Sequence, residues 1–179
     1  MKRIAIIGSG GAGKTTLGLA MSECLDIPVF HLDRMYWQPG WVLSDHEDVR
    51  PHLEDVMARD TWIIDGNYGS SIEERIRRAD TVIFLDMPVW VCVFGAVRRY
   101  FQYRGTHRPD MTEGNNERLT LDFLGWIFGY RRNRRPRVLA LLNARRHDTR
   151  ITILRSRGES REFVRALSAT GSSSRTPSG

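Results

Sequence analysis

An apolar run of four residues, IAII at 4–7, leads directly into the glycine-rich sequence GSGGAGKT at 8–15. The run is typical of a buried parallel strand, and the residues after Lys14 place Leu17 and Met21 at helical spacing. Gly-x-x-x-x-Gly-Lys-Thr between a strand and a helix is the pattern of a phosphate-binding loop. In such a loop, backbone N–H groups and the helix N-terminus surround the phosphate. The order strand, loop, helix therefore predicts an α/β domain with a nucleotide site.

Each residue of the loop receives a predicted role. We expect Lys14 to reach the β- and γ-phosphates and to act in catalysis, and Thr15 to offer its hydroxyl to a magnesium ion. The glycines allow successive N–H groups to point at the phosphate without obstruction by a Cβ. The residues predicted to bind the nucleotide here are Gly8, Ser9, Gly10, Gly11, Ala12, Gly13, Lys14, Thr15 and Thr16.

Further apolar runs alternate with helical patterns along the chain. Strands are expected at 4–7, at 29–32 ending before Asp33, at 61–65, at 81–86 and at 150–154. Helices are expected at 14–24, 72–79, 89–103, 117–130, 136–144 and 159–167. Ser44 and Glu47 form a capping box for one more helix, which Pro51 is expected to break or restart. This alternation predicts a three-layer α/β fold, a five-stranded parallel sheet flanked by helices, with the ligand crevice at the carboxyl ends of the strands.

The length of 179 residues fits one domain. We expect this domain to span 1–168, with a lid of helix and loop at about 104–135, followed by a disordered Ser- and Gly-rich tail at 169–179. Cys24 and Cys92 lie in apolar helical contexts and are expected to be buried free thiols. No apolar stretch approaches the roughly 18 residues of a membrane helix, so a cytoplasmic protein without a membrane partner is expected.

Aspartates follow three of the predicted strands and are the candidate acidic groups of the site. Asp65, followed by Gly66, is the preferred magnesium ligand, and Asp86 competes for that role or caps the next helix. Asp33 would face the side of the crevice where the acceptor binds, and would bind or deprotonate a hydroxyl; its alternative role is a helix cap. Arg34 and Trp37 follow it and are candidate acceptor contacts, a charge and a stacking face, although packing in the core or at a hinge is the more usual role of a residue such as Trp37.

Positive charge is concentrated in one half of the chain. Residues 98–165 carry 17 arginines against seven acidic residues, whereas the whole chain has a net charge of +6. Arginines that a closing lid delivers would neutralise charge on a transferring phosphoryl group, although a charge run is more often a solvated helix face. Two clusters qualify, one formed by Arg98, Arg99, Arg104 and Arg108 and the other by Arg131, Arg132, Arg134 and Arg135.

The motifs IAIIGSGGAGKTTL, VFHLD, WIIDGN and VIFLDMP and the arginine-rich lid, in that order, resemble the adenylate kinase-related P-loop proteins. This group contains nucleoside monophosphate, shikimate and gluconate kinases. More narrowly, HLDRMYW, WIIDGNY and RPDMTEGNNERL resemble the bacterial DNA topology modulation proteins, and the resemblance covers nearly all of 1–165.

The resemblance implies ATP as nucleotide and Mg²⁺ as its ion, held by Thr15 and Asp65. It places Gly66 and Asn67 beside the acceptor, and Asp33 in the position of the shikimate-type aspartate. Arg99 is the best match to a phosphate-contacting arginine, with Arg98 beside it. Arg155, with Ser156 and Arg157, would line the adenine. The segment Asn67–Tyr68 departs from the signature of the monophosphate kinases, so the acceptor stays unidentified.

Three functions remain open from the sequence. The first is a small-molecule kinase that transfers the γ-phosphate of Mg-ATP to an acceptor, with Asp33 as base and Arg99, Arg104 and Arg108 as catalytic cations. The second is an ATP-dependent regulator with weak nucleic-acid binding through the basic half, and the third is a hydrolytic switch. The oligomeric state is not determined by any motif.

Overall fold

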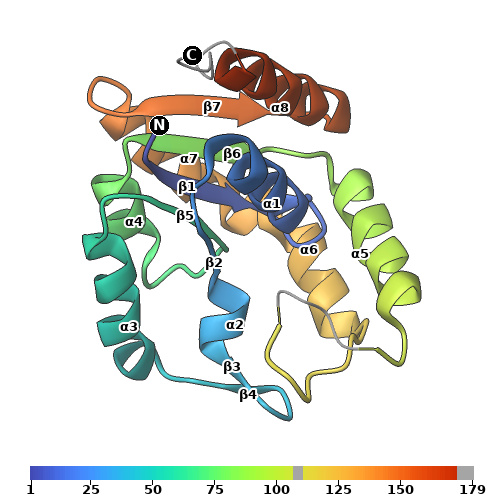
Figure 1. Ribbon diagram of the computed structural model, residues 1–179. Coiled ribbons are helices and arrows are strands. Elements are labelled where there is room, and N and C mark those ends of the chain that lie inside the picture. The colour runs from blue at the N-terminus through green and yellow to red at the C-terminus, as the bar shows by residue number, and fades with distance from the viewer. Residues whose placement is uncertain (107–110, 173–179) are drawn as a thin grey trace, which may run out of the picture.

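A five-stranded parallel sheet forms the centre of the molecule, with the strand order β2-β5-β1-β6-β7 (Figure 1). The computed structural model describes residues 1–106 and 111–172. The strands of the sheet are β1 (Arg3–Gly8), β2 (Val29–His31), β5 (Trp62–Asp65), β6 (Thr81–Leu85) and β7 (Arg150–Leu154). A separate antiparallel hairpin pairs β3 (Trp37–Gln38) with β4 (Val42–Leu43).

The helices surround this sheet on both sides, as Figure 1 shows. In chain order, the helices of the described residues are α1 (Lys14–Leu25), α2 (Leu32–Tyr36), α3 (His46–Ala58), α4 (Ile72–Arg78), α5 (Val89–Tyr103), α6 (Leu121–Asn133), α7 (Arg135–Arg145) and α8 (Arg157–Ser172). The predicted three-layer α/β fold is therefore confirmed.

The central strand β1 contributes to both halves of the core, because alternate residues of a strand point to opposite faces. Ile4 and Ile6 pack with residues of α1, α5 and α8, while Ala5 and Ile7 pack with residues of α3, α4 and α7. Burial on both faces explains why the run at 4–7 is uniformly apolar.

The second strand ends earlier than the sequence predicts. β2 pairs only with β5, and the last pair of this edge ladder joins His31 to Asp65, where β5 itself ends. The chain then turns into the short helix α2, so Asp33 is a helical residue and not the residue after a strand. The turn nevertheless leaves Asp33 at the carboxyl end of the sheet.

The prediction for the next helix was wrong in two respects. Ser44 and Glu47 form no capping box: α3 starts at His46, and the hydroxyl of Ser44 instead accepts a hydrogen bond from Gln38. Pro51 lies inside α3 without breaking it. The helix continues because its later turns bury Leu53 and Val56 in the core.

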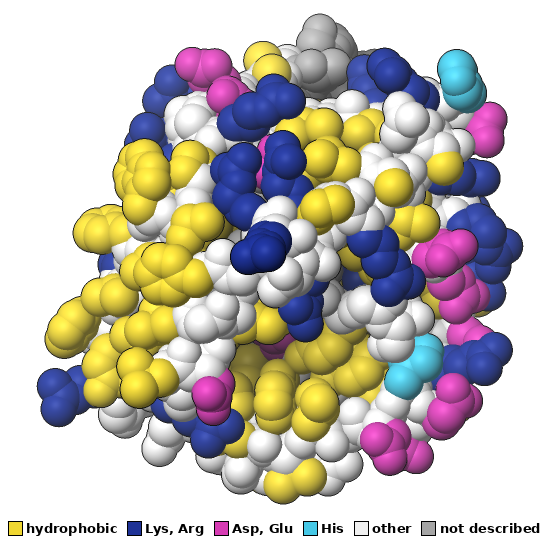
Figure 2. All heavy atoms as spheres, turned by 180° about the vertical axis from the view of Figure 1, so that it is seen from behind, with side chains coloured by type: hydrophobic (Ala, Val, Ile, Leu, Met, Phe, Trp, Pro, Cys, Tyr) yellow, Lys and Arg dark blue, Asp and Glu magenta, His cyan; other side chains and the backbone are white. Residues whose placement is uncertain are grey.

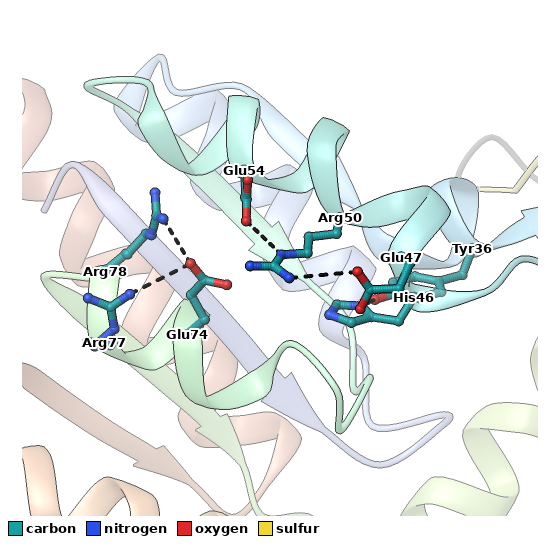
Figure 3. Close-up of polar contacts among 8 residues, drawn as sticks. All are labelled: Tyr36, His46, Glu47, Arg50, Glu54, Glu74, Arg77 and Arg78. Atoms are coloured by element: carbon teal, nitrogen blue, oxygen red, sulfur yellow. Dashed lines mark hydrogen bonds and ion pairs between the residues drawn. The ribbon is translucent and has the colours of Figure 1, made fainter.

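The ion pairs on α3 and α4 shown in Figure 3 stay within their own helices. Arg50 pairs with Glu47 and Glu54, and the carboxylate of Glu74 pairs with Arg77 and Arg78. These are neighbours at i,i+3 and i,i+4 on a helix surface, which is the usual solvated arrangement of such charges.

The segment predicted as a lid has two parts. Helix α6 starts at Leu121, later than the predicted residue 117, because the hydroxyl of Thr120 caps it by accepting from the N–H of Phe123 at 3.2 Å. Ile127 and Tyr130 of this helix are buried in the core, so the second half of the segment packs as part of the domain.

The last helix is longer than expected, since α8 continues to Ser172 and takes in the first residues of the predicted tail. The hydroxyl of Ser168 lies 3.0 Å from the Cys24 thiol of α1, and Leu167 packs in the core beside that helix. Cys24 is half-buried and Cys92 is buried, both as free thiols. Residues 173–179 lie outside the described residues. Within the described residues, none of the helices combines the length and the apolar composition of a membrane span.

Candidate active site

The glycine-rich loop connects β1 to α1 and is held from behind by helix α5. Gly13 has φ 99° and Gly11 has φ 73°, both in the left-handed region that favours glycine. A Cβ on Gly11 would overlap the carbonyl oxygen of Cys92 in α5, so helix and loop are in direct backbone contact. The Arg157 guanidinium donates to the Gly11 carbonyl at 3.0 Å and secures the loop from the β7–α8 side.

A cleft of about 1650 Å³ opens in front of this loop, at the carboxyl ends of the strands. Figure 2 shows the surface hollowed there, with basic side chains above the opening and apolar ones below it. The predicted site residues that line the cleft are Gly10, Gly11, Gly13, Lys14, Thr15, Thr16, Asp33, Asp65, Gly66, Asn67, Arg98, Arg99 and Arg155.

Other predicted site residues lie elsewhere. Arg34 borders a separate small hollow with Phe30 and His52, because α2 turns its side chain away from Asp33. Arg104 is exposed beyond the end of α5, and Arg108 lies outside the described residues. The loop residues behind the cleft surface are Gly8, Ser9 and Ala12.

Lys14 is half-buried and lines the cleft, near two carboxylates. Its ammonium donates to the carbonyl of Ser9 at 3.1 Å. Burial lowers the pKa of Lys14, while the charges of Asp33 and Asp65 act in the opposite direction and raise it. The three side chains are thus close enough to interact electrostatically, which is the arrangement that a triphosphate and its ion require.

Asp65 and Asp86, the two competing candidates for the magnesium ligand, have different surroundings. Asp65 Oδ1 lies 2.9 Å from Nδ1 of His31, and its Oδ2 is buried with no hydrogen-bond partner among the described residues. Asp86 instead makes a two-bonded ion pair with Arg135, at 2.7 and 2.8 Å. A buried carboxylate oxygen without a protein partner is suited to a cation, so Asp65 together with Thr15 fits Mg²⁺ and Asp86 does not.

Asp33 accepts a hydrogen bond from a residue to which the sequence assigned no role. The Tyr68 hydroxyl donates to Asp33 Oδ1 at 3.0 Å. Burial and the Asp33 charge raise the pKa of Tyr68, so this hydroxyl stays protonated. The Tyr68 ring is stacked on Tyr36, with centroids 3.9 Å apart, and the Tyr36 hydroxyl lies 2.7 Å from His46 (Figure 3 shows the last pair). Asp33 is therefore oriented by a rigid aromatic stack.

A fully buried arginine holds the loop that carries Tyr68. Arg75 of α4 donates to the carbonyls of Gly66 and Tyr68 at 3.2 and 3.4 Å, and to the hydroxyl of Ser71. Burial lowers the pKa of Arg75 to about 10. The loop after β5, and with it the Tyr68 hydroxyl, is thus fixed from inside the protein.

We expect Arg75→Met to lower the free energy of unfolding by about 2–4 kcal/mol, because buried carbonyls lose charged donors while the side-chain volume is kept. Urea denaturation followed by circular dichroism measures this. Arg78→Met on the same helix, which breaks a partly exposed ion pair, is the control and should change the free energy by under about 1 kcal/mol. If the two variants lower the free energy of unfolding equally, the hydrogen bonds of Arg75 to the loop after β5 do not stabilise the fold.

The segment 111–118 docks onto the β3–β4 hairpin and closes the far side of the cleft. The Thr112 hydroxyl donates to the carbonyl of Trp37 at 2.6 Å. The buried Asn115 amide donates to the carbonyl of Gln38 at 2.9 Å and accepts from the N–H of Trp41 at 2.7 Å. The Arg118 guanidinium lies over the Trp41 ring, 4.4 Å from its centroid. Hairpin and segment thus form one connected wall.

Arginines from several elements face the cleft. Arg99 is paired with the buried carboxylate of Glu117 at 2.8 Å and lies over the ring of Phe123, which covers the loop at Gly10. Sequence reasoning placed Arg98 and Arg99 there, but it gave no individual role to Arg118, Arg134 or Arg137, which also line the cleft. Arg118 lies before α6, and Arg134 and Arg137 lie at the start of α7. The sequence pattern does not show toward which side of the molecule these side chains point.

The sheet order, the glycine-rich loop between β1 and α1 and the flanking helices match the fold of solved P-loop kinases. Three solved structures share it. A gluconokinase from Sinorhizobium meliloti 1021 matches with a TM-score of 0.52 and 17% identity, over 96% of this chain and 92% of that one. A shikimate kinase from Bacteroides thetaiotaomicron matches with a TM-score of 0.51 and 19% identity, over 94% of this chain and 97% of that one. A deoxyadenosine kinase from M. mycoides matches with a TM-score of 0.51 and 12% identity, over 95% of this chain and 98% of that one.

Sequence comparison identifies one distant relative. The protein YqaC of Bacillus subtilis strain 168, described as uncharacterized, is 27% identical over 134 residues, or 72% of each chain. No protein-family model matches the sequence. The structural neighbours therefore establish the fold alone.

Proposed function

We propose that this protein is an ATP-dependent small-molecule kinase. The observation that carries the proposal is the convergence of Lys14, Asp33 and Asp65 in one cleft, in front of a phosphate-binding loop. Lys14 and the loop are suited to the triphosphate, and Asp33 to the attacking hydroxyl. The wall formed by 111–118 and the hairpin supports transfer over hydrolysis, because transfer requires that water be excluded.

In the proposed reaction, an acceptor oxygen attacks the γ-phosphorus in line with the bond to the β–γ bridging oxygen, which breaks and leaves with ADP. Asp33 takes the proton of the acceptor hydroxyl, and the Tyr68 hydrogen bond keeps its carboxylate pointed at that proton. Lys14 and Arg99 stabilise the charge on the transferring group. A magnesium ion held by Thr15 and Asp65 would supply further charge neutralisation on the phosphate oxygens.

The acceptor end of the cleft carries both a carboxylate and cations. Asp33 lies on one side, and Arg118 and Arg137 line the same space with Trp37. Guanidinium groups bind carboxylates and phosphates with two parallel hydrogen bonds. We therefore propose an acceptor with a hydroxyl group and a separate anionic group.

The test is transfer of labelled γ-phosphate from Mg-ATP to a panel of nucleoside monophosphates, hydroxy acids, sugar phosphates and neutral sugars. A labelled product from an anionic acceptor is the expected result. Labelled inorganic phosphate alone, at a rate that no acceptor changes, would contradict the kinase proposal and favour a hydrolytic switch. A product from neutral sugars alone would contradict only the anionic acceptor.

The alternative function, a nucleic-acid-associated regulator, draws on the charge of residues 98–165. Several of these arginines line the cleft instead of forming a continuous outer face, among them Arg98, Arg99, Arg118, Arg134 and Arg137. This distribution supports phosphate binding inside the cleft. Retention on duplex DNA that falls steeply with salt and survives saturating ATP would favour the regulator.

We expect Asn115→Ala to raise the ratio of ATP hydrolysis to transfer by about tenfold, because the substitution removes both hydrogen bonds from the buried side chain to the hairpin and lets water enter. Labelled phosphate and labelled product are measured in the same reaction. The neighbouring exposed Asn116→Ala is the control and should keep the wild-type ratio. If the two variants have the same ratio, the wall does not exclude water.

A further inference from the structure

Helix α5 presents an apolar stripe to solvent. Trp90 is 74% exposed, Phe94 65% and Phe101 67%, with half-buried Val97 between them. The intervals of four, three and four residues are those of a coiled-coil seam, in which each side chain inserts between side chains of a partner helix. In Figure 2, apolar side chains gather at the left edge of the molecule, where α5 of Figure 1 lies after the rotation.

The fold of the chain itself does not need this stripe. The opposite side of α5 is already buried, with Cys92 and Ala96 against the phosphate-binding loop and the core. The charged residues of the helix are Arg98 and Arg99; Arg99 turns to Glu117, and Arg98 borders the cleft. The stripe itself therefore carries no charge, and an equally apolar surface is the partner that it fits.

The order of the side chains makes the stripe complementary to itself. In an antiparallel pair of α5 helices with its twofold axis between Gly95 and Ala96, Trp90 faces Phe101 of the other copy and Phe94 faces Val97. A twofold interface requires this reciprocity, in which two residues exchange roles across the axis. Arg98 then lies opposite position 93, away from the arginine of the other copy.

The exposed aromatic area supplies about half of a standard interface. Three aromatic side chains, each with ~200 Å² of surface and about two-thirds exposed, offer about 400 Å² per chain, against the ~800 Å² per partner of a standard stable interface. Helix α6, which contacts α5, carries two further exposed apolar residues, Leu121 and Phe128, at 86% and 62% exposed. We expect the surface that flanks the seam to supply the remaining area.

We propose that two copies of this chain associate through α5, antiparallel, with the seam Trp90, Phe94, Val97 and Phe101 at the centre of the interface. Because the other side of α5 touches Gly11, each phosphate-binding loop then lies one helix away from the second copy. Trp90 and Phe94 also stand at the edge of the cleft, so the pair places the two nucleotide ends near the twofold axis.

The test is the mass of the full chain in solution, by light scattering after size exclusion. We expect twice the chain mass of 20.6 kDa for the wild type and 20.6 kDa for Phe94→Arg. Leu19→Arg, at an exposed apolar residue of α1, is the control and should remain a dimer. Circular dichroism and thermal unfolding of each variant establish that it folds. A monomeric wild type at ~100 μM, or a Phe94→Arg dimer, would overturn the proposal.

Two further measurements separate this partner from others. Phe94→Cys chains mixed with Val97→Cys chains, both in a Cys24→Ser background, should form a mixed disulfide dimer in higher yield than either chain alone. Monomers that sediment with anionic phospholipid vesicles would assign the stripe to a membrane surface instead. If Phe94→Arg lowers the affinity for ATP without changing the mass in solution, the stripe contacts the nucleotide base and not a second copy.

Discussion

Replacing Lys14 by alanine is expected to lower kcat/KM for phosphoryl transfer by about 10²–10³-fold, the usual cost of losing one preorganised donor to developing charge. The effect should be large because the ammonium is held in place by the Ser9 carbonyl and by the charges of Asp33 and Asp65. Steady-state transfer to the best acceptor of the panel measures it, together with the dissociation constant of ATP.

The chain contains a matched control, since Lys2 and Lys14 are its lysines. Lys2 is exposed and lies just before β1, outside the cleft, and Lys2→Ala should transfer phosphate at the wild-type rate. Lys14→Ala with unchanged transfer and a normal unfolding midpoint would show that the turnover does not occur at this loop, and would remove the main support for the kinase proposal.

The fold is predictable from local pattern because its central strands are buried on both faces. The runs at 4–7, 61–65 and 81–86 are apolar without alternation, and the structure places them side by side as β1, β5 and β6. At the edge of the sheet the apolar pattern does not predict where the strand ends. Strand β2 ends at His31 because its one neighbour, β5, ends opposite it, and the sequence of residues 29–33 carries no information about that pairing.

Predictions about the site depended on whether a residue acts through the backbone or through its side chain. The loop at 8–15 was identifiable because glycine and lysine at fixed spacing define its geometry. The choice between Asp65 and Asp86 needed the partner of each carboxylate: Arg135, which neutralises Asp86, comes from a helix 49 residues later in the chain. Two further features likewise depend on packing between distant parts of the chain: the orientation of the Arg34 side chain, and the hydrogen bonds from Arg75 to the carbonyls of Gly66 and Tyr68.

Asp33→Asn is expected to lower kcat by about 10²–10⁴-fold, because the amide has nearly the shape of the carboxylate but cannot take the proton of the acceptor. The KM for the acceptor should change little, since the amide still binds a hydroxyl. Transfer measured over a range of acceptor concentrations separates the two constants. A raised KM with unchanged kcat would show that Asp33 binds the acceptor without acting as its base.

Tyr68→Phe tests how Asp33 is positioned, because it removes only the hydroxyl that donates at 3.0 Å. In the wild-type background it should lower kcat about tenfold, corresponding to about 1.4 kcal/mol for a hydrogen bond to a charged group. In the Asp33→Asn background the same change should have almost no further effect, since the base on which the hydroxyl acts is already gone. Equal losses in both backgrounds would mean that Tyr68 contacts the acceptor itself.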